Sequence, residues 1–346
     1  MSIGVTSEEP SATPSGDNGS EGLSKVETEV YDRQIRLWGM EAQNKLRAAN
    51  VLLCGLSGLG AEISKNLMLC GIRSLTLVDE KNVTEEDVDS NFLLENNSIG
   101  KNRARASSQK ARALNPMVKL EVLEASVGSL SPEFVSNFTL VVLCDQKYSD
   151  VVFWNEKCRQ LKIGAAEKKQ DAVCDGDGGG TSSAPEAIDV DAENVLEKKK
   201  GQTVFLLQKY QYPSIEEAFN VDWSKKQLVR KSRRVIPCSY FPLKAMLRAQ
   251  KEEKLCADEE KNVKILTELW TEEVLVANHE IEKQTVQAEK FDYFFGSQLS
   301  PVCAIVGGLA GQEAIKAISE NGRPLRNIFI YSALDSTGTM CMFPPP

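Results

Sequence analysis

Three glycines and one aspartate have the residue types and the spacing of a phosphate-binding loop. Gly55, Gly58 and Gly60 follow a short apolar run, and Asp79 closes the next such run roughly 20 residues later. Glycines allow a tight turn with close backbone approach, the following helix offers free N–H groups to phosphate, and the acid can bind a ribose hydroxyl. This arrangement predicts a nucleotide-binding strand–turn–helix unit.

One position departs from the dinucleotide-binding pattern. Ser57 stands where that pattern has its second glycine, so its side chain occupies the space through which a pyrophosphate would approach. Two interpretations remain open: residual contact with a nucleotide, or glycines that serve only tight turning and close helix–sheet packing. A nicotinamide-dependent (NAD) oxidoreductase would also account for the unit, but Ser57 and the scarcity of proton-transfer side chains argue against it.

The number and spacing of histidines and cysteines limit the catalytic and metal sites that this chain could form. His279 is the single histidine, so a multi-histidine metal site is excluded, and a Ser-His-Asp or Cys-His site would have to use that residue. The nine cysteines include no C-x-x-C pair, so we expect no metal site. Cys54, Cys144 and Cys303 lie in apolar segments and are expected to be buried thiols. Cys174 lies in low-complexity sequence that offers nothing to hold a substrate.

Length and charge exclude several classes of protein. The chain has 346 residues, and its 41 Lys+Arg against 49 Asp+Glu give a net charge of −8. An acidic chain is a poor match for nucleic acid, which binds electropositive surfaces. No apolar run approaches the roughly 18 residues of a membrane-spanning helix, and the N-terminus lacks the apolar core of a secretory signal. We therefore expect a protein of a reducing compartment that binds neither nucleic acid nor membrane.

Alternating strands and helices must position these residues. Residues 51–54 form a short, wholly apolar run that is typical of a buried parallel strand, and further strands are expected over 74–78, 119–123 and 139–144. Helical segments lie between them, from the glycine loop to residue 70 and over 102–114. This alternation predicts an α/β fold with a doubly wound, Rossmann-like parallel sheet. A small-residue helix over 301–318 and a strand over 327–331 follow near the C-terminus.

Composition divides the chain into five segments. Residues 1–27 have the composition of a disordered tail, and residues 165–203 that of a low-complexity, acidic and glycine-rich insertion. Residues 204–295 are highly charged and largely helical in pattern, which predicts a helical insertion. The segments 28–164 and 296–346 are then the N-terminal and C-terminal parts of one α/β domain.

A more specific signal lies ahead of the glycine loop, in the nonapeptide YDRQIRLWG of residues 31–39. Further matches follow in order: GLGAE at 58–62, IGKNRA at 99–104, LNP at 114–116, VDW at 221–223 and PVCAIVGG at 301–308. On these motifs the chain resembles the ThiF-like adenylation domain of ubiquitin-like-modifier activating enzymes, and among them the heterodimeric enzymes that activate SUMO. The resemblance is dense over 28–160 and 296–334, and it is absent from 1–27 and 165–203.

The family pairs two related adenylation domains, of which only one holds a complete ATP site and the nucleophilic cysteine. This chain resembles the incomplete half. Ser57 interrupts its glycine run, Glu80 and Lys81 replace the second aspartate of catalytic halves, and residues 90–93 lack their nucleotide-binding arginine. Asp145 matches the magnesium-binding aspartate, but the arginine that follows it in catalytic halves is absent. The resemblance implies that the glycine loop and its aspartate are vestigial, and that Mg-ATP binds to the partner subunit rather than to this chain.

The resemblance also gives Arg33 a catalytic role in trans. In the family the arginine of this nonapeptide reaches across the heterodimer into the partner's ATP site and helps to hold the phosphates. A helix with its apolar stripe over Tyr31, Ile35 and Trp38, interrupted at Gly39, would leave Arg33 off that stripe. Its guanidinium would suit phosphate well. The alternative interpretation is a solvated surface arginine.

The partners and the activity are likewise implied by the resemblance. The chain would be the regulatory, singly inactive subunit of a nuclear heterodimer, with the catalytic subunit and SUMO as partners and the conjugating enzyme as an indirect one. The complex would adenylate the modifier and transfer it as a thioester to a cysteine of the partner subunit. A self-sufficient adenylating enzyme and a non-catalytic interaction module are the alternatives. After Ala166 the chain passes directly into low complexity where the family has a further strand, so one sheet element is expected to be missing.

Overall fold

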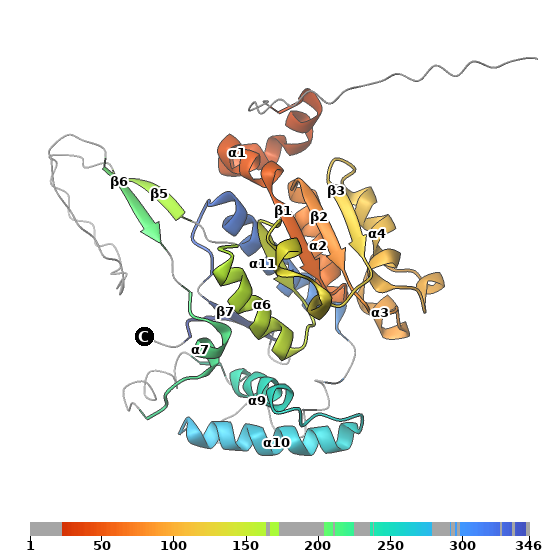
Figure 1. Ribbon diagram of the computed structural model, residues 1–346, viewed down its shortest axis with the longest axis vertical. Helices are drawn as coiled ribbons and strands as arrows, with labels where there is room; N and C mark the ends of the chain where they lie inside the picture. Colours follow the sequence, from red (N-terminus) through yellow and green to blue (C-terminus); the bar gives the residue numbers. More distant parts are fainter. Residues whose placement is uncertain are drawn as a thin grey trace, which may run out of the picture.

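The computed structural model describes residues 23–163, 167–172, 204–209, 212–224, 236–237, 239–278, 291, 295, 298–325, 327–333 and 336–343. Its main body is a parallel sheet with helices on both faces, and a smaller helical body lies beside it (Figure 1). Among the described residues the sheet has four strands in the order β3-β2-β1-β4, which confirms the predicted α/β class. They are β1 (Asn50–Cys54), β2 (Ser74–Val78), β3 (Lys119–Leu123) and β4 (Leu140–Leu143).

The two faces of the sheet pack against different helices, because side chains alternate along each strand. Val51 and Leu53 face one helical layer, made of α1 (Lys25–Ala48), α2 (Gly58–Cys70), α4 (Arg103–Leu114) and α11 (Ser300–Ser319). Leu52 and Cys54 face the other layer, made of α5 (Pro132–Val135) and α6 (Tyr148–Gln160). Three short elements complete the connections: α3 (Glu85–Ser90), η1 (Asn96–Ser98) and η2 (Val127–Ser129).

Helix α1 begins inside the segment predicted to be a disordered tail. The helix begins at Lys25 because Ser24 and Glu27 form a capping box: Ser24 Oγ accepts a hydrogen bond from the Glu27 N–H at 3.2 Å, and Glu27 Oε2 accepts one from the Ser24 N–H at 2.9 Å. The predicted boundary is therefore wrong, while residues 1–22 lie outside the described residues. The predicted interruption is confirmed, since Gly39 has the non-helical angles φ 88° and ψ 165°.

The smaller body contains helices within the predicted helical insertion. They are α7 (Ile215–Phe219), α9 (Tyr240–Lys251) and α10 (Glu259–Val276). The predicted C-terminal strand is β7 (Ile328–Ser332), but it pairs antiparallel with β8 (Thr337–Cys341), which the sequence did not reveal. The end of this hairpin packs among the helices, where the rings of Tyr240 and Phe343 stack with centroids 4.4 Å apart. The hairpin therefore does not extend the parallel sheet.

Strand β4 forms one edge of the sheet. It pairs with β1, no described strand lies on its other side, and all four of its apolar residues are only partly buried. Strands β5 (Glu167–Ala172) and β6 (Val204–Lys209) pair with each other in a separate antiparallel ribbon (Figure 1). The predicted insertion over 165–203 stays a prediction; within it, residues 167–172 pair through their backbone with β6, which their charged composition did not predict. Residues 173–203 lie outside the described part of the chain.

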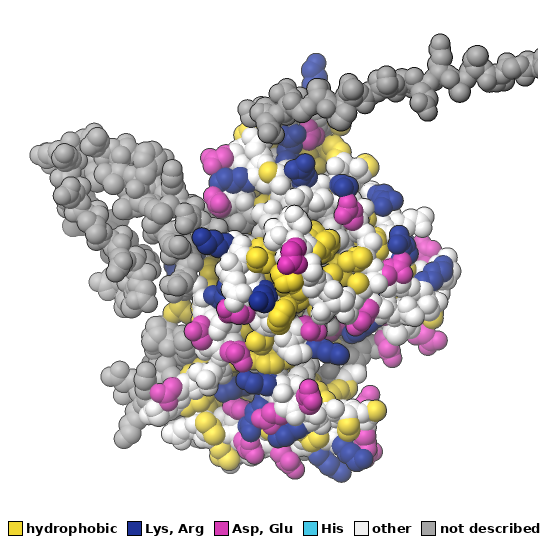
Figure 2. Space-filling view, viewed as in Figure 1, with side chains coloured by type: hydrophobic (Ala, Val, Ile, Leu, Met, Phe, Trp, Pro, Cys, Tyr) yellow, Lys and Arg dark blue, Asp and Glu magenta, His cyan; other side chains and the backbone are white. Residues whose placement is uncertain are grey.

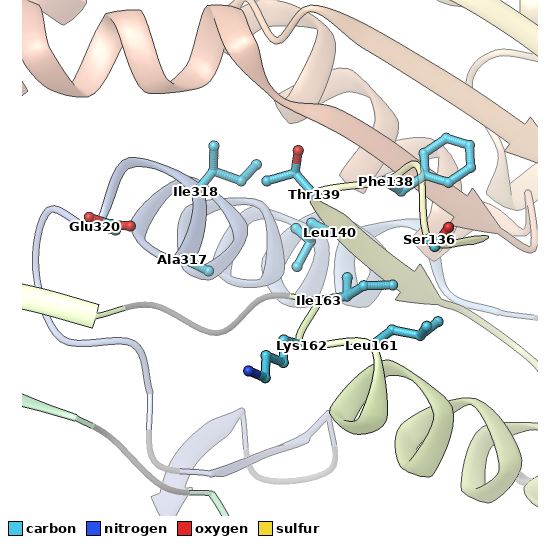
Figure 3. Close-up of a pocket in the computed structure, with 10 residues that line it drawn as sticks. All are labelled: Ser136, Phe138, Thr139, Leu140, Leu161, Lys162, Ile163, Ala317, Ile318 and Glu320. Atoms are coloured by element: carbon cyan, nitrogen blue, oxygen red, sulfur yellow. The ribbon is translucent and has the colours of Figure 1, made fainter. Parts of the chain in front are cut away.

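A cavity of about 270 Å³ opens beside the start of β4 (Figure 3). It lies where the chain leaves α6 and where the end of α11 approaches the sheet. Its lining residues are Ser136, Phe138, Thr139, Leu140, Leu161, Lys162, Ile163, Ala317, Ile318 and Glu320.

Helix α11 is long and apolar enough to cross a membrane by length and composition alone, contrary to the expectation from the sequence. One third of its most apolar stretch is buried inside the protein, and the helix packs along α2. A Cβ at Gly307 would lie 2.5 Å from Glu62 Cβ, and one at Gly311 would lie 2.6 Å from Asn66 Cβ. The small residues of α11 are therefore accounted for by its close approach to α2.

Candidate functional site

The glycine loop joins β1 to α2, as predicted, and the protein itself requires each of its glycines. Gly55 has a φ of 93°, and a Cβ there would lie 1.9 Å from the carbonyl oxygen of Cys144. A Cβ at Gly60 would lie 2.0 Å from the Gly55 carbonyl oxygen, and one at Gly58 would lie 2.8 Å from that of Ser90. Distances this short exclude a side chain. Tight turning and close packing therefore suffice to explain the three glycines without a nucleotide.

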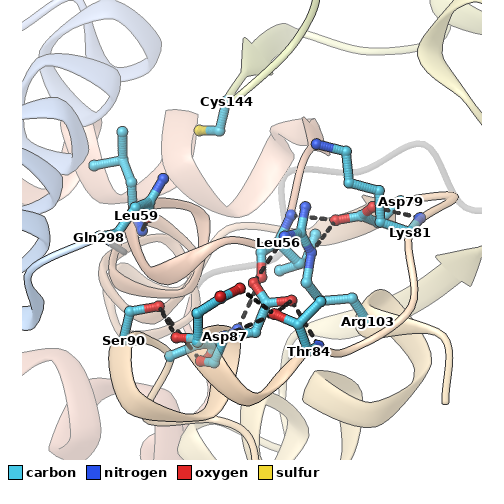
Figure 4. Close-up of polar contacts among 12 residues, drawn as sticks. Leu56, Leu59, Asp79, Lys81, Thr84, Asp87, Ser90, Arg103, Cys144 and Gln298 are labelled. Carbon is cyan, nitrogen blue, oxygen red and sulfur yellow. Dashed lines mark hydrogen bonds and ion pairs between the residues drawn. The ribbon is translucent and has the colours of Figure 1, made fainter. Parts of the chain in front are cut away.

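The N-terminus of α2, where a phosphate would bind, is already in contact with a side chain of the same chain. Gln298 Oε1 accepts a hydrogen bond from the Leu59 N–H at 3.3 Å (Figure 4). It accepts another from the Cys303 thiol at 3.5 Å. Ser57 stands at the N-cap and is only 3% exposed, yet its hydroxyl has no hydrogen-bond partner among the described residues. Gln298 thus uses one of the N–H groups that a helix N-terminus offers to an anion.

Asp79 follows β2, as predicted, but internal donors occupy its carboxylate. The residue is 5% exposed. Its Oδ2 accepts hydrogen bonds from the Leu56 N–H at 2.7 Å and from Arg103 Nε at 2.8 Å, and its Oδ1 accepts one from the Lys81 N–H at 2.9 Å (Figure 4). Three internal donors thus use most of the roughly four lone-pair positions of the carboxylate. The carboxylate therefore holds the loop in place and is poorly placed to bind a sugar.

Arg103 was not singled out from the sequence, although it organises this region. It is 4% exposed and bridges two carboxylates, Asp79 at 2.8 Å and Asp87 at 2.9 Å. Burial opposes the charged guanidinium, but the two carboxylates outweigh that effect and raise the pKa of Arg103. A signal was present: Arg103 is the first residue of α4, where the helix dipole disfavours a cation. Nearby carboxylates offset that unfavourable interaction.

The cysteines predicted to be buried are buried. Burial raises the pKa of Cys54 and of Cys144 to about 12, and it also raises that of Cys303. Because the thiolate is the nucleophile, thiols held protonated in this way are poorly suited to form a thioester. Cys174 and His279 lie outside the described residues.

Asp145, which matches the magnesium-binding aspartate of catalytic halves, lies just after β4. It is exposed and has a φ of 58°, in the left-handed region. Within the described ranges, no group of three or more His, Cys, Asp or Glu residues could hold a metal ion. The sequence prediction that this chain has no metal site stays a prediction.

Arg33 lies far from the glycine loop, because the two are at opposite ends of α2. Its helix, α1, packs at the C-terminal end of α2, whereas the loop precedes the N-terminal end of that helix (Figure 1). Arg33 is exposed, as the apolar stripe predicted, and within the described chain it makes no hydrogen bond or ion pair. Arg36 on the same helix pairs with Asp32 at 3.0 Å. The predicted site residues therefore do not form one site: the loop and Asp79 come together, and Arg33 points to solvent elsewhere.

A family model and the curated relatives show to which family the chain belongs. A model of the ThiF family matches residues 31–345. The chain is 42% identical over 340 residues to SUMO-activating enzyme subunit aos-1 of Caenorhabditis elegans, covering 93% of this chain and 99% of that protein. It is 32% identical over 348 residues to SUMO-activating enzyme subunit 1 of Homo sapiens, covering 93% and 97%. The solved structure of E. coli tRNA N6-threonylcarbamoyladenosine dehydratase is 21% identical, covers 40% of this chain and 59% of that one, and has a TM-score of 0.37. The chain therefore belongs to the ThiF family, as a homologue of SUMO-activating enzyme subunit 1.

Proposed function

We propose that this chain is the regulatory subunit of a heterodimeric SUMO-activating enzyme. In that complex, Mg-ATP bound to the partner subunit drives adenylation of the C-terminus of SUMO. SUMO then passes as a thioester to a cysteine of the partner and on to the conjugating enzyme. Homology to SUMO-activating enzyme subunits over nearly the whole chain supports membership of such a complex. The observation that supports the non-catalytic role is that the Asp79 carboxylate already accepts hydrogen bonds from three donors of the same chain.

Binding of a nucleotide to this chain would disrupt existing contacts. A ribose at Asp79 would compete with the internal donors, which include Arg103, and a phosphate at α2 would compete with the side chain of Gln298. Breaking a buried ion pair costs about 3–5 kcal/mol. We therefore expect the isolated chain to show no ATP–pyrophosphate exchange and no thermal shift with Mg-ATP. Exchange by the isolated chain would instead indicate a self-sufficient adenylating enzyme.

The surface around Arg33 supports a role in trans. Val26, Val30 and Leu37 are 62%, 56% and 78% exposed, and with Arg33 they follow each other at spacings of four and three residues. Such spacing places them on one face of α1. An exposed apolar stripe of this kind suits a protein partner. A partner that covered the stripe would remove Arg33 from water, which is favourable only where an anion receives the guanidinium. The phosphates of ATP on the partner subunit would be such an anion.

Reconstitution with the catalytic subunit tests the role of Arg33. Arg33→Ala should lower adenylation of SUMO by about a hundred-fold, the scale of removing one donor to a developing negative charge. Arg36→Ala is the matched control, because it removes an exposed arginine from the same helix and should leave the rate unchanged. Size-exclusion chromatography should show an intact heterodimer in both cases. Equal rates for the two variants would leave the chain as an interaction module without a catalytic contribution.

Location and surface charge complete the proposal. We place the complex in the nucleus on the strength of the family resemblance, with the basic clusters at 198–200 and 230–234 as candidate import signals. Both clusters lie outside the described residues. Acidic and basic side chains are interspersed over the face in Figure 2, a distribution unlike the basic areas that bind nucleic acid. Microscopy of a fluorescent fusion, with and without the clusters, tests the location.

A further inference from the structure

Three side chains from outside α2 cap its C-terminal turn. The last carbonyl groups of a helix have no partner within the helix. Here three side-chain amide groups donate to them. Asn115 Nδ2 donates to Met68 O at 2.9 Å, Gln34 Nε2 to Leu69 O at 3.0 Å, and Gln43 Nε2 to Cys70 O at 3.1 Å. We call these three carbonyl groups the α2 socket. Two of its donors belong to α1, so the socket is where α1 is attached.

Tyr31 joins α1 to the same place. Its hydroxyl accepts a hydrogen bond from Asn115 Nδ2 at 2.8 Å, and the residue is 2% exposed. Gly71, which ends α2 with a φ of 76°, makes room for the ring, since a Cβ there would lie 2.4 Å from Tyr31 Cζ. Tyr31 and Gln34 therefore hold one turn of α1 against the end of α2.

The direction of Arg33 follows from this attachment. Arg33 lies between Tyr31 and Gln34 in the sequence and projects to solvent, while Gln34 donates to the α2 socket and Tyr31 accepts from Asn115, which also donates to the socket. Gly39 breaks the helix further along, so the turn that carries Arg33 is not held by continuous helix from the stretch that enters β1 but by side-chain contacts, those at the α2 socket and the ion pair of Arg47 with Glu27 at 2.9 Å. The socket contacts therefore set the rotation of this turn about the helix axis.

The side chain of Gln34 leaves one buried polar atom without a hydrogen bond, an energetic cost that packing does not explain. Its Oε1 is buried and has no hydrogen-bond partner in the part of the chain that the structure describes, although its Nε2 donates to the socket. A buried acceptor without a partner destabilises the folded state, whereas an apolar side chain of similar length would not. The glutamine is therefore better explained by the orientation that its single donated bond imposes on α1.

We propose that Tyr31 and Gln34 are positioning residues for Arg33. Their attachment at the α2 socket holds this turn of α1 in the orientation that directs the Arg33 side chain towards the partner's ATP phosphates. The inference rests on the proposed function in trans. The need for such aiming is chemical, because a displacement of about 1 Å in a group that contacts reacting phosphates can lower a rate by about a hundred-fold.

A double-mutant cycle in the reconstituted heterodimer tests the inference. Tyr31→Phe removes only the hydroxyl, and Gln34→Met removes the amide at similar length. Each should lower ATP–pyrophosphate exchange by about three- to ten-fold, the value of one hydrogen bond. In the Arg33→Ala background neither change should lower the rate further, because there is no longer a guanidinium to aim. Ser131→Ala is the control: it removes a helix cap of α5, away from α1, and should lower stability without lowering the rate.

The outcomes separate this inference from the proposed function. If Arg33→Ala lowers exchange while Tyr31→Phe and Gln34→Met match the parent rate, the positioning role is wrong and the role of Arg33 stands. If both changes lower the rate equally with and without Arg33, they act through stability, and the positioning role is again wrong. If Arg33→Ala itself leaves the rate unchanged, the proposed function fails first and the positioning role fails with it.

Discussion

Replacing Gly307 by alanine should force α2 and α11 apart, whereas the same change at the neighbouring Gly308 should not. A Cβ at Gly307 would lie 2.5 Å from Glu62 Cβ, an atom fixed to the backbone of α2. At Gly308, which is exposed, a Cβ would meet no atom within 4 Å. The two positions share the same helix and the same chemistry of substitution, so they differ only in what the new methyl group meets.

The magnitude follows from two opposing terms. Alanine in place of glycine favours a helix by about 1 kcal/mol, so Gly308→Ala should raise the free energy of unfolding by about that amount. At Gly307 the same gain is opposed by overpacking of about 1–3 kcal/mol. Non-bonded carbon atoms prefer separations of about 3.5–4.0 Å, so the helices would have to separate by about 1 Å and the upper part of that range applies. We therefore expect Gly307→Ala to be less stable than Gly308→Ala by about 3 kcal/mol.

Urea unfolding followed by circular dichroism measures this difference through the midpoint concentrations and slopes. Thermal unfolding gives an independent value, since about 2 °C of Tm corresponds to each kcal/mol for a chain of this size, or about 6 °C between the two variants. A Gly307→Ala protein as stable as Gly308→Ala would refute the close packing of α2 on α11. Gly311, one turn further along, should behave like Gly307, because its Cβ would lie 2.6 Å from Asn66 Cβ.

Three further outcomes follow from buried and capping groups. Arg103→Met should lower the free energy of unfolding by about 3–5 kcal/mol, because two carboxylates lose their buried cation. Arg105→Met, which removes an exposed ion pair, should cost at most about 1 kcal/mol, and equal losses in urea unfolding would contradict this reasoning. The hydrogen bond from the Ser24 N–H lowers the pKa of Glu27 from its usual 4.5, so the stability that Glu27 adds is present above pH 4.5 and is lost as pH falls through the lower folded-state pKa. The difference in Tm between the parent and Glu27→Gln should shrink over that range, and a constant difference would argue against the effect. Iodoacetamide at neutral pH should label the exposed Cys256 of the native protein, and mass spectrometry should detect no label on three buried thiols with pKa values of about 12, namely Cys54, Cys70 and Cys144.

Features with a local physical cause could be predicted from the sequence. Residues 51–54 of β1 are wholly apolar because both faces of that central strand are covered, and the break at Gly39 follows from the backbone freedom of glycine. The burial of Cys54 follows from the strand in which it lies. The exposure of Arg33 follows from helical periodicity, since it lies off the apolar stripe.

Features that depend on distant parts of the chain could not be predicted. Gln298 reaches the N-terminus of α2 only because α11 packs along that helix, and no local pattern marks it as a cap. The pairing of β7 with β8, and its packing on the helical body, likewise depend on tertiary contacts. Arg103 is intermediate: its place at the start of α4 indicates a need for carboxylates, but the sequence does not say which ones.

The contacts of Asp79 affect how genetic experiments on this subunit should be interpreted. Through its own carboxylate and the guanidinium of Arg103, Asp79 ties together the glycine loop, the start of α4 and helix α3. An Asp79→Ala allele would therefore reduce the amount of folded subunit and of assembled enzyme. A growth defect in such a strain would not by itself reveal lost nucleotide binding. Only activity normalised to the quantity of assembled complex can distinguish scarcity of the enzyme from a defect in its chemistry.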